Sequence, residues 1–157
     1  MLKVCLLGAV AALLTVLIDQ ASKWWAISFL AGPPRTEIEV VPGFLRLAYT
    51  TNPGAAWGLF AEHTFWLAIV SLVVVAILLW RFPAMTDGWP ERGLGLGLLI
   101  GGVVGNLVDR IKLGAVVDFI DVNLHFYDWP IFNVADSAIS VGIVIYLISV
   151  VLRKEAV

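Results

Sequence analysis

The sequence predicts an all-α polytopic membrane protein with four transmembrane helices and a small β element between helices 1 and 2. Of its 157 residues, 61% are hydrophobic and only 14% are charged, whereas soluble domains carry about 25% charged residues. Four apolar segments free of charge are separated by polar connections. In the first connection, two β-favouring stretches flank the turn signal Pro42-Gly43. These three observations define the fold class.

The first apolar segment follows Lys3 and is rich in alanine and leucine, as secretory signal peptides are. Asp19, Lys23 and the three later apolar segments favour a retained helix. Each charge-free core is shorter than the roughly 20 residues that cross a bilayer, so the spans extend into their polar flanks. We predict a single integral membrane domain over residues 1–157, with spans at about 4–26, 64–82, 93–110 and 135–153.

The connection between the first two spans favours β structure on both sides of Pro42-Gly43, at residues 37–41 and 44–49. The edge of a sheet cannot lie in hydrocarbon with its backbone groups unpaired. We therefore expect a β-rich extramembrane segment over about residues 33–62, lying at the membrane surface.

The third span is rich in glycine, and Gly97, Gly101 and Gly105 repeat every four residues along one helical face. Small residues at this spacing allow helix backbones to approach closely in lipid. We expect this face to form the seam of the helix bundle.

The polar residues come to one face of the membrane if the four spans alternate in direction. These residues are Asp19, Gln20, Lys23, Asn52, Asn106, Asp109, Arg110, Asp118, Asn133 and Asp136. An ionisable group at the edge of lipid is costly and is by default a functional candidate. Asp118 and Asp136 each stand in an apolar run, and each is the expected partner of the other.

Helical spacing groups these residues further. Asn106 and Arg110 are four residues apart and share one face of the third span. Asp19 and Lys23 have the same spacing, which fits either an ion pair at the end of a span or part of a site. Asp136 starts the fourth apolar helix, so it can be a helix N-cap as well as a functional group.

Several other functions lack their sequence features. A net charge of −2 argues against nucleic-acid binding, which requires clustered basic residues. The lone Cys5 has no partner thiol, and His63 and His125 form no zinc motif. There is no Gly-x-Ser-x-Gly nucleophile motif.

Five sequence blocks lie at residues 19–23, 52–58, 105–110, 116–120 and 132–137. In this order they resemble the lipoprotein signal peptidases (signal peptidase II). The family usually has phenylalanine where this chain has Trp57. The five blocks together are far more specific than any one of them.

The resemblance implies an aspartic endopeptidase of the bacterial inner membrane, with Asp118 and Asp136 as its catalytic pair and with no metal or cofactor. The implied substrates are prolipoproteins, cut just before a cysteine that carries a diacylglyceryl group; the partners would be these substrates and membrane lipid, and the enzyme would act as a monomer. Around the site the resemblance places Asp19, Lys23, Asn52, Gly54, Asn106, Arg110, Asn133 and Ala135.

Two other functions remain open. A proton-coupled transporter also carries membrane carboxylates, but near the midplane between repeated halves, and no repeat is visible. A metal-dependent hydrolase could use Asp118, Asp121 and Asp136 as oxygen ligands. Chelation distinguishes the metal-dependent hydrolase from the aspartic peptidase.

Basic residues divide evenly between the two faces of the alternating topology, five on each, so the positive-inside rule does not orient the chain. The resemblance implies cytoplasmic termini and an active site toward the extracytoplasmic face.

Overall fold

Four long helices and a three-stranded sheet make up the part of the chain that the computed structural model describes, residues 1–34, 36–54, 59–60, 63–127 and 129–154. The elements are α1 (Leu2–Leu30), β1 (Glu37–Val41), β2 (Leu45–Asn52), α2 (Thr64–Thr86), α3 (Pro90–Leu113), β3 (Val116–Val122) and α4 (Val134–Lys154). All four helices are long and apolar enough to cross a membrane. The predicted fold class, four such helices with a β element between the first two, is confirmed.

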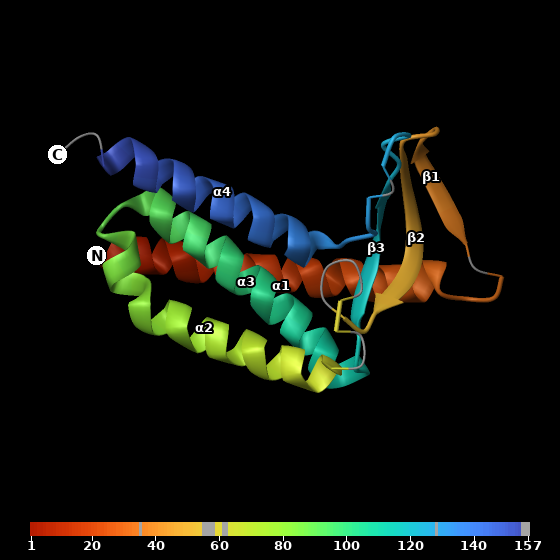
Figure 1. Cartoon of the computed structure of the whole chain (residues 1–157), viewed down its shortest axis with the longest axis horizontal. Helices are drawn as coiled ribbons and strands as arrows, with labels where there is room; N and C mark the ends of the chain where they lie inside the picture. Colours follow the sequence, from red (N-terminus) through yellow and green to blue (C-terminus); the bar gives the residue numbers. More distant parts are fainter. Residues whose placement is uncertain (35, 55–58, 61–62, 128, 155–157) are drawn as a thin grey trace.

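The helices are arranged around α3, which packs against α1, α2 and α4 (Figure 1). The start of α1 and the end of α4 lie at one end of the bundle, and the sheet stands across its other end. Large apolar side chains on the outer surfaces of α1, α2 and α4 are exposed, as expected for helices that face lipid.

The glycine seam on α3 is confirmed. A Cβ added to Gly101 would lie 2.7 Å from the backbone oxygen of Ala12 on α1, and one added to Gly105 would lie 2.5 Å from a carboxylate oxygen of Asp19. Gly102 meets α4 in the same way, with Ala135 O at 2.5 Å. The glycines of α3 therefore permit close contact with two neighbouring helices.

Replacing Gly101 with alanine should separate α1 from α3, because the new methyl group would meet backbone that cannot rotate away. We expect a loss of about 1–3 kcal/mol in the free energy of unfolding, which is typical of overpacking. Thermal unfolding in detergent measures it. Gly32→Ala is the control, since nothing lies within 4 Å of the added Cβ, and equal melting temperatures for the two variants would contradict the seam.

The sheet is antiparallel, in the order β1-β2-β3. Its third strand comes from the connection between α3 and α4, far along the chain from the β1–β2 hairpin. The final turns of α1 support the sheet, because the fully buried Ala26 and Leu30 pack against Phe119 of β3. Asp118 precedes Phe119 and pairs with Thr50 of β2, so this packing also fixes where Asp118 lies.

Candidate active site

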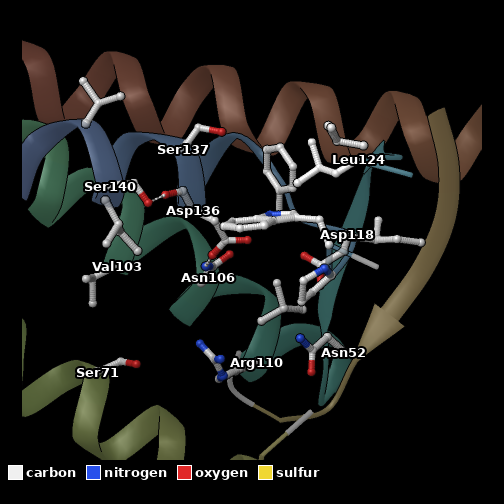
Figure 2. Close-up of a pocket in the computed structure, with 18 residues that line it drawn as sticks. Asn52, Ser71, Val103, Asn106, Arg110, Asp118, Leu124, Asp136, Ser137 and Ser140 are labelled. Carbon is white, nitrogen blue, oxygen red and sulfur yellow. Dashed lines mark hydrogen bonds between the residues drawn. The ribbon is translucent and has the colours of Figure 1, made fainter. Parts of the chain in front are cut away.

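Two aspartates face one cavity where the sheet meets the helix bundle. Asp118 belongs to β3 and is 2% exposed, and Asp136 lies in the first turn of α4. Both line a cavity of about 770 Å³ (Figure 2). Asn133 joins them, because its Nδ2 donates to Asp118 Oδ1 at 2.7 Å and its backbone N–H donates to Asp136 Oδ2 at 3.2 Å. The structure thus brings together the two acids expected to be partners.

The start of α4 shows why Asp136 points into the cavity. The Asn133 side chain accepts a hydrogen bond from the Asp136 N–H at 2.9 Å, while the Asp136 carboxylate accepts one from the Asn133 N–H. This reciprocal pair is a capping box. The prediction that Asp136 is itself the N-cap residue is therefore wrong. Asn133 caps the helix, and Asp136 is the third helical residue, which bonds back to the cap.

Asn106 on α3 holds the other oxygen of Asp136. Its Nδ2 donates to Asp136 Oδ1 at 2.8 Å, and its Oδ1 accepts from Lys23 Nζ at 2.8 Å and from Asn133 Nδ2 at 3.1 Å. An ammonium group can only donate, so Lys23 fixes which end of the Asn106 amide faces Asp136. Asn106 thereby links the acid to a buried charge cluster.

That cluster, which we call the lysine cluster, consists of Asp19, Lys23 and Asp109. Lys23 Nζ lies 2.9 Å from Asp19 Oδ2 and 2.8 Å from Asp109 Oδ2, and the three side chains are 0–5% exposed. Asp19 also accepts the Ala135 N–H at 2.9 Å, and Asp109 accepts the Val117 N–H at 3.2 Å. The lysine cluster therefore ties α1 and α3 to the residues beside both candidate acids.

Asp19 and Lys23 are thus both an i,i+4 ion pair and part of the surroundings of the site. Asp109 and Gln20 are absent from the site set implied by the resemblance, although Gln20 Nε2 donates to Asp109 Oδ1 at 2.9 Å. The sequence feature that indicates Asp109 is its spacing, since it stands one helical turn from Asn106.

The end of β2 reaches the cavity through Asn52. Asn52 Oδ1 accepts the Gly54 N–H at 3.0 Å, and Gly54 O accepts a hydrogen bond from Arg110 Nη2 at 3.0 Å. The Asn52 side chain also hydrogen-bonds Asp118. Asn52 and Arg110 both line the cavity (Figure 2). Trp57 lies outside the described residues.

Burial is the main reason that the pKa of Asp118 rises from 3.8 to about 7, and the nearby Asp136 carboxylate raises it further. Hydrogen bonds from Asn133 and Asn52, together with the charge of Lys23, offset part of this rise. A carboxyl group with a pKa near neutral can hold its proton and donate it in acid–base chemistry.

The three-aspartate metal site does not form. Asp121 instead pairs with Arg46 of β2, with its Oδ2 2.5 Å from Arg46 Nε. Across the described part of the chain, no group of three or more His, Cys, Asp or Glu side chains is placed to hold a metal ion. His63 and His125 are both exposed and lie on different connections.

Comparison with known proteins agrees with this site. The sequence pattern of the family described as signal peptidase (SPase) II matches residues 11–152. The chain belongs to the signal peptidase II family. It is therefore a multi-pass membrane protease of the bacterial inner membrane, as the resemblance implied.

Relatives and solved structures match over nearly the whole chain. A protein named lipoprotein signal peptidase from Desulforapulum autotrophicum is 36% identical, covering 98% of this chain and 94% of its own. One of the same name from Thermodesulfovibrio yellowstonii is 40% identical over 88% of this chain and 90% of its own. A solved structure described as a bacterial membrane enzyme superimposes with a TM-score of 0.81 at 32% identity, covering 95% of this chain and 88% of that one.

Proposed function

We propose that this signal peptidase II family member is an aspartic endopeptidase that removes the signal peptide from diacylglyceryl-modified prolipoproteins, cutting before the lipidated cysteine. The observation that carries the proposal is the convergence of Asp118 and Asp136 on one cavity, joined through Asn133. The names of the relatives, lipoprotein signal peptidases, support the substrate class.

In the proposed reaction, Asp118 is the neutral acid and Asp136 is the carboxylate. Asp136 takes a proton from water as the water oxygen attacks the scissile carbonyl carbon, and Asp118 gives its proton to the carbonyl oxygen. The product is a gem-diol bound to no enzyme atom. Asp118 then regains a proton from one gem-diol hydroxyl, while Asp136 gives its proton to the leaving amine and the C–N bond breaks. Both carboxyl groups return to their starting states.

Asn106, Asn133 and the lysine cluster are positioning groups in this proposal. Asn106 donates to Asp136, Asn133 donates to both acids, and Lys23 orients the Asn106 amide. Asn52 and Arg110 line the cavity, and both hydrogen-bond the backbone of Gly54. The buried Ala135 donates its backbone N–H to the Asp19 carboxylate.

The test is cleavage of one prolipoprotein with and without its diacylglyceryl group. The lipid should hold the scissile bond at the depth of the dyad, since each buried CH₂ contributes roughly 0.8 kcal/mol to membrane anchoring. We expect purified protein in liposomes to cut the lipidated form and to leave the other almost intact. Equal cleavage of both forms would contradict the substrate class.

The pH profile should show that Asp118 acts as the acid. Since its pKa is about 7, kcat/KM should fall about tenfold per pH unit above that value, as Asp118 loses its proton. Asn52→Ala removes a hydrogen bond that lowers this pKa, so the fall should begin at higher pH. Initial rates in detergent from about pH 5 to pH 9 measure both profiles. A flat profile above pH 7 would contradict this assignment.

The start of α1 and the end of α4 lie at the end of the bundle opposite the sheet (Figure 1). We also propose that the termini are cytoplasmic and that the site faces outward, as the family resemblance implies. A single cysteine in a Cys5→Ser background reports the orientation. An impermeant thiol reagent should label Phe126→Cys in intact cells and leave Asp87→Cys unlabelled. The reverse pattern would overturn the orientation. We propose that the enzyme acts as a monomer, because residues of β2, β3, α3 and α4 of a single chain suffice to form the cavity that holds both acids.

A further inference from the structure

The cavity extends from the dyad in two directions. One part runs along the sheet, past Val122 and Trp129. The other part runs between the helices, where α2, α3 and α4 contribute Ser71, Val103 and Ser140 (Figure 2). We call this second part the helix wing. Ser140 is six residues into α4, so the helix wing reaches roughly 9 Å down the helix from its start.

Ser137 lines the cavity directly after Asp136, and its Oγ donates to Asn133 O at 3.0 Å. Farther along the helices, the polar side chains of the helix wing among the described residues are Ser71 and Ser140. Each donates its only hydrogen to the carbonyl four residues earlier, Ser71 Oγ to Leu67 O at 2.8 Å and Ser140 Oγ to Asp136 O at 2.9 Å. A hydroxyl that already donates can still accept through its lone pairs. The helix wing therefore offers hydrogen-bond acceptors to whatever enters it.

We propose that Ser71 and Ser140 accept hydrogen bonds from backbone N–H groups of the signal peptide just before the scissile bond, and so position the substrate. The inference rests on the proposed function. A signal peptide crosses the membrane, so its end approaches the dyad along the helices, while the mature chain leaves over the sheet.

An extended peptide in lipid needs hydrogen-bond acceptors for its backbone N–H groups. A peptide bond must leave the helical conformation to reach both carboxyl groups, and the N–H groups released from the helix are costly in hydrocarbon unless they are paired. Valine and isoleucine form the rest of the helix wing, at Val103, Ile139 and Val141, and their side chains offer no such pairing. The serine hydroxyls supply acceptors for the backbone N–H groups of the unwound peptide segment.

The experiment compares Ser71→Ala and Ser140→Ala with Ser28→Ala, using kcat/KM for a lipidated prolipoprotein peptide in detergent. Ser28 Oγ donates to Trp24 O at 2.9 Å in the same i−4 geometry and is exposed, as Ser140 is, but it lies on α1 and does not line the cavity. Each cavity variant should lose roughly three- to tenfold in kcat/KM, the effect of one hydrogen bond. Ser28→Ala should be unchanged, and Ser140→Thr, which keeps the hydroxyl, should restore most of the activity.

A substrate with ester linkages in place of the amides just before the scissile bond separates positioning from a structural role. The ester lacks the N–H, so wild-type enzyme should lose activity on it while Ser71→Ala and Ser140→Ala lose little more. The inference would be overturned if replacing the amide by an ester lowered kcat/KM equally in wild type and in both variants. It would also be overturned if kcat/KM of both cavity variants on the amide substrate lay within twofold of wild type. Failure of wild-type enzyme to cut the lipidated amide substrate would instead overturn the proposed function.

Discussion

Asp118→Asn and Asp136→Asn should each reduce cleavage of a lipidated prolipoprotein by roughly 10⁴-fold or more, the scale seen when one member of a catalytic unit is removed. Asparagine fills nearly the same space as aspartate, but it cannot take the proton from water or pass a proton to the gem-diol. The Asp118→Asn/Asp136→Asn double variant should be little worse than either single variant, because the proposed mechanism uses the two acids as a unit.

The matched control is Asp121→Asn on the same strand as Asp118. Its carboxylate pairs with Arg46 and does not line the dyad cavity, so activity should stay within a few-fold of wild type. Cleavage of the lipidated substrate in liposomes gives all four rates. Near-normal activity of well-folded Asp118→Asn or Asp136→Asn protein would contradict the dyad.

Loss of activity in Asp118→Asn should not come from unfolding. The folded-state pKa of Asp118 is raised to about 7, so the native state holds this proton more tightly than the unfolded chain does. The resulting stabilisation is fully present below about pH 4 and is lost as pH rises toward 7. Above pH 7 the variant removes a poorly solvated charge, and its melting temperature should equal or exceed that of wild type.

Lys23→Met should cause the largest loss of stability. It leaves two buried carboxylates, Asp19 and Asp109, without their cation, and breaking a buried pair from one side costs about 3–5 kcal/mol. Activity should fall as well, since the Asn106 amide that holds Asp136 loses its fixed orientation. Denaturant titration in mixed detergent micelles measures the free energy of unfolding.

The sheet offers a matched comparison for this variant. Arg46 also bridges two carboxylates, Glu37 and Asp121, but its side chain is 52% exposed. Ion pairs exposed to solvent contribute about 0–1 kcal/mol, so Arg46→Met should cost far less than Lys23→Met. Neutralising all three members with Asp19→Asn/Lys23→Met/Asp109→Asn should recover much of the stability lost in the single variant. Equal losses in Lys23→Met and Arg46→Met would contradict the role of burial.

The sequence by itself determined the features that depend on local composition and spacing. Apolar length alone predicts the four helices, because crossing a bilayer requires a continuous hydrophobic stretch. The four-residue repeat at Gly97, Gly101 and Gly105 predicts the seam, since small residues on one face let backbones touch. Asp118 and Asp136 were identifiable as candidates because charge in an apolar run is costly.

Only the tertiary structure decided how those candidates are connected. The Asp19 carboxylate binds the Ala135 N–H across 116 positions of the chain, and β3 joins a hairpin formed some 70 residues earlier. Asn133 could not be recognised as both the helix cap and the bridge between the acids, and Asp109 could not be placed beside Val117. Hydropathy and spacing describe neighbours along one element, whereas these contacts depend on which helix faces meet when α3 packs between α1 and α4.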